Sequence, residues 1–200
     1  MARDLKSGTL THVRQAHLIL ITGLPGTGKS TLARALALHF GVPLICKDTI
    51  KEPLLDVIGA ADRAESRRLS DASFAVVFAL ARDCLRAGVD LILEGNFRPG
   101  QHETDLLTAI PPVVESVHVT QVLCRASEPI RIARLTARAA DPSRHEGHRD
   151  ADLAAEQAPP SLDFLTLPGE RLVFDSDVAS TQMQSLLEFI EQQRSVSFYV

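Results

Sequence analysis

Residues 23–30 of this 200-residue chain read Gly-Leu-Pro-Gly-Thr-Gly-Lys-Ser. This pattern requires glycines, a lysine and a hydroxyl residue at fixed spacing, so it constrains the fold more than any other segment. An apolar run of strand length, His17 to Thr22, precedes it, and a segment with helical periodicity, Ser30 to Phe40, follows it. A strand, a glycine-rich loop and a helix in this order favour a phosphate-binding loop over a chance glycine turn.

The residue types in the loop suit an anion. Gly23, Gly26 and Gly28 lack a Cβ, which lets the backbone curl around a phosphate and adopt positive φ. The loop amides and the start of the following helix are expected to point at that phosphate. We expect Lys29 to bridge the β- and γ-phosphates of ATP and the Ser30 hydroxyl to ligate Mg²⁺. The predicted nucleotide-binding residues of the loop are Gly23, Leu24, Pro25, Gly26, Thr27, Gly28, Lys29, Ser30 and Thr31.

Composition limits the alternatives. The chain is 45% hydrophobic and 23% charged with a net charge of −4, which is typical of a globular protein and argues against a general nucleic-acid-coating role. We expect a single domain over 1–200, with a loose N-terminal arm over 1–16. No signal-peptide-like or membrane-spanning apolar stretch is present. Cysteines far apart in apolar surroundings suggest reduced thiols and a cytoplasmic protein.

Strand and helix patterns alternate along the chain. Strands are predicted near 17–22, 44–47, 90–94, 117–124 and 171–175, and helices near 29–40, 48–58, 71–87, 101–109, 128–140 and 181–193. Such alternation predicts right-handed crossovers and a parallel sheet with helices on both faces. Ligands of these sheets bind beyond the carboxyl ends of the strands, so polar residues at those ends are the candidates for chemistry.

Two carboxylates stand at predicted strand ends. Asp48 follows the second strand, where a carboxylate can accept a proton from an attacking hydroxyl, can cap a helix, or can do both. Glu94 ends the third strand and is expected to orient Mg²⁺ through water or to bind the acceptor, the alternative being a cap on local amides. Asn96 and Arg98 follow on the loop as candidate acceptor contacts, although Asn is also common in turns.

Arg131, Arg134 and Arg138 share one face of the helix predicted over 128–140. Aligned cations repel one another unless an anion lies nearby, and a triphosphate supplies one. We expect Arg134 and Arg138 to contact phosphate, the alternative being a solvated basic face. Residues 139–160 are predicted to form a mobile lid over the phosphates. The histidines at 145 and 148 lack further ligands at zinc spacing.

With these residues, the chain resembles the small P-loop kinases of the nucleoside-monophosphate-kinase-like fold. Within them it is most similar to the branch that contains the polynucleotide kinase domain, the zeta toxins and chloramphenicol phosphotransferase. The resemblance covers most of 17–193 and rests on the 23–30 loop, Asp48, the Glu94-Gly-Asn96 turn and the spacing of Arg134 and Arg138. Glu94 departs from the pattern, because many relatives carry Asp there.

The resemblance implies a fold and roles. The fold is the α/β P-loop NTPase three-layer α/β/α sandwich, with a five-stranded parallel sheet in the order 2-3-1-4-5 and an Arg-bearing lid. Asp48 would be the general base for the acceptor hydroxyl, and Arg134 would clamp the transferring phosphate. The adenine would lie near Arg125, Asp175 and Ser176.

These observations predict an ATP- and Mg²⁺-dependent kinase that phosphorylates a hydroxyl of a small molecule. The predicted catalytic residues are Lys29, Asp48, Arg134 and Arg138, the predicted acceptor contacts are Asp48, Glu94, Asn96 and Arg98, and the predicted Mg²⁺ contacts are Ser30 and, through water, Glu94. The chain has no Trp and one Tyr, so aromatic side chains that could stack on nucleic-acid bases are scarce, and a nucleic-acid partner is disfavoured.

Three alternatives remain open at this point: a nucleotide switch or ATPase that acts on a partner protein, a zeta-toxin-like nucleotide-sugar kinase, and a polynucleotide 5′-kinase. A monomer or homodimer without a membrane partner is expected. The residues carry no recognisable code for the acceptor or for ATP against GTP.

Overall fold

The computed structural model describes residues 15–109, 117–148, 150–155 and 162–196. The predicted N-terminal arm therefore lies outside the described residues except for Gln15 and Ala16. Ala16 is not part of an arm, because it begins the first strand and is buried. Within the described ranges, no helix combines the length and the apolar character needed to cross a membrane.

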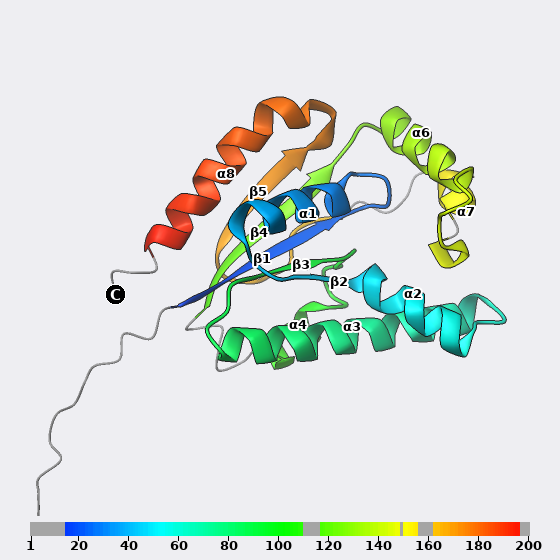
Figure 1. Ribbon diagram of the computed structural model, residues 1–200, viewed down its shortest axis with the longest axis horizontal. Helices are drawn as coiled ribbons and strands as arrows, with labels where there is room; N and C mark the ends of the chain where they lie inside the picture. Colours follow the sequence, from blue (N-terminus) through cyan, green and yellow to red (C-terminus); the bar gives the residue numbers. More distant parts are fainter. Residues whose placement is uncertain (1–14, 110–116, 149, 156–161, 197–200) are drawn as a thin grey trace, which may run out of the picture.

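A five-stranded parallel sheet forms the middle layer (Figure 1). Its strands are β1 (Ala16–Gly23), β2 (Leu44–Cys46), β3 (Leu91–Glu94), β4 (Val117–Arg125) and β5 (Glu170–Asp175). Their order is β2-β3-β1-β4-β5, which confirms the predicted order 2-3-1-4-5. β1 lies at the centre, and every one of its residues is buried.

Helices cover both faces of this sheet, which confirms the three-layer sandwich (Figure 1). α1 (Lys29–Phe40) and α8 (Ala179–Val196) pack on one face, and α3 (Arg63–Arg86) and α4 (Glu103–Ala109) pack on the other. Because side chains alternate along a strand, Leu18 and Leu20 join the α3 side while Ile19 and Ile21 join the α1 side. The central strand thus contributes to both hydrophobic cores.

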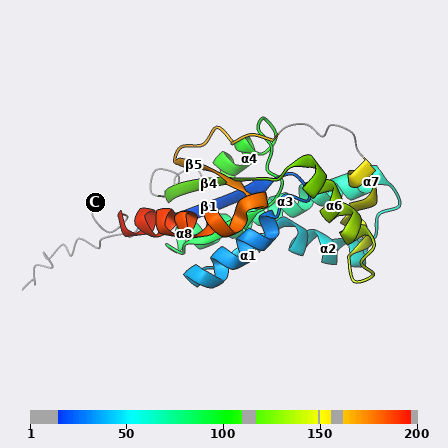
Figure 2. The same cartoon turned by 90° about the horizontal axis from the view of Figure 1, so that it is seen from above.

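Three further helices lie at the carboxyl ends of the strands. α2 (Lys47–Ile58) follows β2 directly, and α6 (Glu128–Ala139) follows β4. α7 (Asp150–Ala155) packs against α6, after a short 3₁₀ turn at Glu146–His148. Figure 1 and Figure 2 both place α6 and α7 at this end of the molecule. The region predicted as a mobile lid therefore contains helical structure; its mobility stays a prediction, and residues 156–160 lie outside the described ranges.

Helix α3 begins earlier than the sequence analysis predicted, at Arg63 rather than at residue 71. The Asp62 carboxylate accepts hydrogen bonds from the amides of Ala64 (2.8 Å) and Glu65 (2.9 Å). The Glu65 carboxylate in turn accepts from the amide of Ala61 at 2.7 Å. These reciprocal bonds satisfy amides that a helix start leaves open, so an exposed, charged segment still forms a helix.

Asp90 joins three elements at the opposite end of the sheet, where its side chain is 4% exposed. Its carboxylate accepts from the backbone amide of His17 (2.9 Å), at the start of β1. Arg194 of α8 donates to the same carboxylate through Nε (3.1 Å) and forms an ion pair with it through Nη2 (3.0 Å). Asp90 therefore couples the first strand to the last helix.

Asp90→Ala is expected to lower the free energy of unfolding by about 2–3 kcal/mol, because a buried amide loses its acceptor and a guanidinium loses its partner. Urea denaturation measures this change. Asp83→Ala is the control: its carboxylate pairs with Arg82 at 3.4 Å in an exposed position, so it should cost less than about 1 kcal/mol. Equal costs for the two variants would contradict the coupling role.

Candidate active site

The loop over residues 23–30 lies between β1 and α1, at the carboxyl edge of the sheet. Gly26 and Gly28 adopt left-handed φ values of 88° and 82°. The Thr27 hydroxyl donates to the carbonyl of Leu24 at 2.8 Å, and the Thr27 amide donates to the same oxygen at 3.3 Å. Thr27, predicted as a nucleotide contact, is buried and its hydroxyl bonds within its own loop.

The loop has the features of an anion cradle. Within the described residues, the amides of Gly26, Gly28 and Lys29 have no hydrogen-bond acceptor. Lys29 also begins α1, and the first turn of that helix contains no acidic residue. Unsatisfied amides at a helix N-terminus attract anions, so the residues present fit a phosphate. Of the other predicted loop contacts, Leu24, Pro25 and Ser30 are half-buried and Thr31 is exposed.

Glu94 lies at the meeting point of three strands. Its carboxylate is 2% exposed, and its Oε1 lies 3.9 Å from Lys29 Nζ. Its Oε2 accepts a hydrogen bond from Cys46 Sγ at 2.6 Å. Burial, followed by the charge of Glu94 and the hydrogen bond to it, raises the pKa of Cys46 to about 11. The thiol therefore stays protonated and orients the carboxylate toward the lysine.

Asp48 occupies the first turn of α2, directly after β2. Its Oδ1 accepts from Lys47 Nζ at 3.0 Å, and its Oδ2 lies 3.6 Å from His148 Nδ1. Burial acts to raise the pKa of Asp48, but the charges of Lys47, His148 and Lys29 outweigh it and hold the pKa below its usual value. Asp48 is therefore an anion at neutral pH, half-exposed beside the loop lysine.

The turn between α6 and α7 packs onto α2. His148 Nε2 hydrogen-bonds Glu52, and His145 Nε2 lies 3.0 Å from Asp56 Oδ1. His148 also lies near Asp48. Two histidines of this turn thus pair with three acidic residues spaced four positions apart on α2: Asp48, Glu52 and Asp56. A lid over the phosphates stays a prediction, and the structure brings this turn to the candidate base as well. The four-residue spacing of the acids was the signal in the sequence.

The arginines of α6 have separate partners. Arg131 is buried, pairs with Glu128 through Nη2 at 2.7 Å, and donates to the carbonyl of Pro25 at 3.5 Å. Arg134 donates to the carbonyl of Gly26 at 3.1 Å and to the hydroxyl of Ser176 at 2.7 Å. These two arginines therefore support the loop through its carbonyl groups. Arg131 and Arg134 share a helical face, as predicted, but they contact different carbonyl groups of the loop.

Arg138 points instead toward the lid. Its Nη2 lies 3.3 Å from Asp150 Oδ1, in an ion pair whose alignment does not make a hydrogen bond. Its Nε and Nη2 are buried and have no hydrogen-bond partner among the described residues. Buried donors without acceptors are rare in folded proteins, and an incoming phosphate oxygen would satisfy them.

The predicted acceptor contacts on the loop after β3 are less closely connected. Asn96 is half-buried and Arg98 is exposed. The loop itself is held by the hydroxyl of Thr22, which donates to the carbonyl of Phe97 at 3.1 Å, and by the amide of Arg98, which donates to His102 Nδ1 at 2.9 Å. In the described part of the chain, no hydrogen bond or ion pair joins Asn96 or Arg98 to Asp48 or Glu94.

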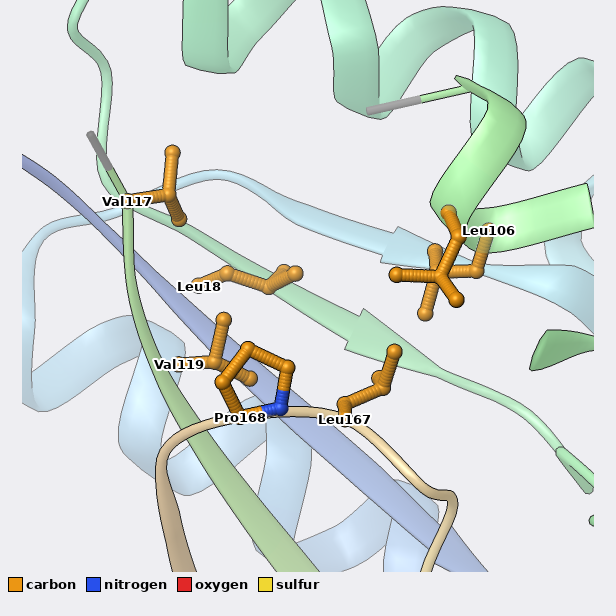
Figure 3. Close-up of a pocket in the computed structure, with 7 residues that line it drawn as sticks. Leu18, Leu106, Val117, Val119, Leu167 and Pro168 are labelled. Atoms are coloured by element: carbon orange, nitrogen blue, oxygen red, sulfur yellow. The ribbon is translucent and has the colours of Figure 1, made fainter. Parts of the chain in front are cut away.

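A small hollow at the other end of the sheet is not a candidate substrate site (Figure 3). It is lined by apolar side chains near the amino ends of β1 and β4, among them Leu18, Val117, Val119 and Pro168. Its volume of about 10 Å³ is that of a single water molecule. A substrate with polar groups would find neither room nor partners there.

Comparison with known proteins agrees with this geometry. A family model described as an AAA domain matches residues 18–159. The solved structure of a candidate kinase from Chloroflexus aurantiacus J-10-fl is 31% identical with a TM-score of 0.76, covering 89% of this chain and 98% of that one. An APS kinase of Mycobacterium tuberculosis, solved with AMPPNP and APS, is 16% identical with a TM-score of 0.55, covering 88% and 98% of the two chains. This second likeness concerns the fold alone.

Curated relatives include uncharacterised proteins of Mycobacterium tuberculosis and Mycobacterium bovis, each 32% identical over 158 residues. The match covers 74% of this chain but 31% of each relative, so the chain spans about a third of their length. Taken together, the comparisons and the sheet order show the fold of a small P-loop kinase.

Gly26→Ala is expected to abolish nucleotide binding. A Cβ at this position would lie 2.9 Å from both Cγ and the carbonyl oxygen of Arg131, and φ is 88°. The measurement is the shift in unfolding temperature on adding Mg²⁺ and a non-hydrolysable ATP analogue.

Gly41→Ala is the matched control. Its φ of 62° is also left-handed, but a Cβ there would meet nothing within 4 Å. This variant should lose about 1–2 kcal/mol of stability from the backbone alone and should keep the nucleotide-induced shift. If Gly26→Ala also keeps that shift, the close contact between loop and α6 is not needed for binding.

Proposed function

Because this chain belongs to the AAA-domain family, we propose that it is an ATP-dependent kinase that phosphorylates a hydroxyl of a small molecule. One observation carries the proposal: an ionised carboxylate, Asp48, lies close enough to the lysine that begins α1, beside the anion cradle, for that lysine's charge to lower its pKa. A switch that only hydrolyses ATP does not need an acceptor base at this point. The candidate kinase of 31% identity supports the same reaction class.

In the proposed reaction, the acceptor oxygen attacks the γ-phosphorus of ATP. A bond forms between these atoms while the bond from the γ-phosphorus to the β,γ-bridging oxygen breaks, and ADP leaves with that electron pair. Asp48 accepts the hydroxyl proton of the acceptor. Lys29 and the loop amides hold the β- and γ-phosphates.

Ser30 and, through water, Glu94 are the residues that would hold Mg²⁺, which, when bound, neutralises charge on the phosphates. Both are oxygen ligands beside the cradle, and Cys46 already orients the Glu94 carboxylate. Within the described residues, no three His, Cys, Asp or Glu side chains form a metal cluster. The oxygens of ATP would therefore have to complete the coordination.

Arg134 and Arg138 have different proposed roles. Arg138 has buried donors that find no hydrogen-bond partner among the described residues, so we assign it the transferring phosphate. Arg134 donates to the carbonyl of Gly26 and to the hydroxyl of Ser176, which supports a role in shaping the loop and the adjoining site expected for the adenine. The same proposal includes a single domain, a cytoplasmic location and a monomer or homodimer.

Asp48→Asn is expected to slow phosphate transfer by about 10²- to 10⁴-fold, because the amide cannot accept the proton. Binding of the ATP analogue, followed by thermal shift, should stay close to that of the unchanged protein. Loss of transfer and binding together would indicate a structural role for Asp48. Asp83→Asn, an exposed carboxylate on α3, is the control and should leave both unchanged.

The pH dependence follows from the sign of the Asp48 shift. Its pKa is lowered in the folded protein, so the carboxylate is ionised throughout the neutral range. Transfer should therefore be insensitive to Asp48 protonation from neutral pH down to about pH 5, and should fall only below the ordinary aspartate range of about 4. The stabilising contribution of this carboxylate is likewise present above its unfolded pKa and lost as pH falls through the folded one. A fall in single-turnover rate centred near neutral pH that Asp48→Asn removes would contradict this assignment.

Nucleotide binding tests the proposal as a whole. Mg²⁺ with the ATP analogue should raise the unfolding temperature of the protein, and Lys29→Ala should abolish that rise. Turnover of ATP should then increase when a suitable hydroxyl compound is added. Absence of any shift with the unchanged protein would end the kinase proposal.

A further inference from the structure

A row of charged side chains extends from the candidate base toward α3. Lys47 Nζ lies 3.0 Å from Asp48 Oδ1, and the Lys47 side chain is buried. Lys51, one helical turn further along α2, reaches across to α3 and donates to the hydroxyl of Ser66 at 3.0 Å. The row thus runs from the proposed chemical step to the contact between α2 and α3.

The two lysines differ in how their charges are compensated. Lys47 has a carboxylate partner in Asp48. Lys51 is half-buried, and in the described part of the chain its side chain hydrogen-bonds to a neutral hydroxyl rather than to a carboxylate. Burial, and then the charge of Lys47, lower the pKa of Lys51, while Asp48 acts in the opposite direction. A partly buried ammonium group that is not hydrogen-bonded to a carboxylate is costly, and a bound anion would lower that cost.

The neighbouring wall of α3 is polar as well. Ser66 and Ser70 are four residues apart, so they share one helical face, and both are half-buried. The Ser70 hydroxyl donates to the carbonyl of Ser66 at 3.2 Å, which keeps this hydroxyl beside Ser66. An ammonium group beside hydroxyls suits an oxyanion better than an apolar ring.

We propose that the phosphate acceptor carries an oxyanion in addition to its reacting hydroxyl, and that Lys51 with Ser66 binds this oxyanion. This inference rests on the proposed kinase function and adds the chemical class of the acceptor. Asp48 and Lys51 are three residues apart on α2, so they are neighbours on one face of the helix. A compact molecule with a hydroxyl and an oxyanion a few bonds apart can therefore contact both.

Isothermal titration of the protein saturated with Mg²⁺ and the non-hydrolysable ATP analogue tests the proposal, because the phosphate loop is then already occupied. The probes are matched pairs with and without a phosphate: glucose 6-phosphate and glucose, glycerol 3-phosphate and glycerol, AMP and adenosine. Inorganic phosphate and sulfate serve as probes of the oxyanion alone. At least one phosphorylated probe should bind about tenfold or more tightly than its parent.

Variants assign the binding to Lys51. Lys51→Gln should weaken the phosphorylated probe about tenfold or more and leave its uncharged parent unchanged, whereas Lys51→Arg should retain most of the affinity. Arg67→Gln, an exposed cation next to Ser66 in sequence, is the matched control and should change neither. Equal unfolding temperatures without ligand, and equal binding of the ATP analogue, show that each variant is folded.

The outcomes separate the two proposals. Equal affinity for every phosphorylated probe and its parent, no binding by any phosphorylated probe, or an unchanged affinity in Lys51→Gln would overturn the oxyanion-bearing acceptor while the ATP analogue still binds. The kinase proposal would then stand with an uncharged acceptor. Failure of the ATP analogue itself to bind would overturn both.

Discussion

The central position of β1 is the constraint on which the rest of the site depends. β1 pairs with β3 on one side and with β4 on the other, so its end cannot shift without disturbing the sheet. The register sets Ile21 opposite Glu94, which brings the third strand's carboxylate to the base of the loop. The helix that follows β4 then supplies the arginines that hold the loop carbonyls.

Opposite charges from different elements alternate around the cradle. Lys29 of α1 faces Glu94 of β3, and Lys47 faces Asp48 at the start of α2. The lid contributes His148 to the same group. Lys29 and Glu94 therefore orient each other across two segments, and Asp48 is oriented by Lys47 beside it and by His148 from another segment. Phosphoryl transfer relies on preorganisation of this kind. In the proposed reaction, closure of the predicted lid would be linked to the position of the candidate base, because His148 belongs to the predicted lid and lies 3.6 Å from Asp48 Oδ2.

The sequence predicted the elements better than their edges and partners. Sheet order came from the resemblance to P-loop kinases, and the structure confirms it. The early start of α3 was readable in the Asp62-x-x-Glu65 pattern but was obscured by its exposed charges. By contrast, the hydrogen bond between Cys46 and Glu94 spans 48 positions in the chain. No local pattern reports a contact of that kind, because it depends on which strands become neighbours.

The sequence by itself determined the phosphate loop, because glycines at fixed spacing after an apolar strand dictate local backbone conformation. It also determined that Glu94 ends a strand and that Asp48 follows one closely, since strand limits follow from local hydrophobic runs. Only the tertiary structure decided what each charge meets: Arg131 supports the loop, Arg138 faces Asp150, and the two lid histidines reach α2. The physical reason is that electrostatic partners are chosen by distance in space, which the parallel sheet creates between residues far apart in sequence.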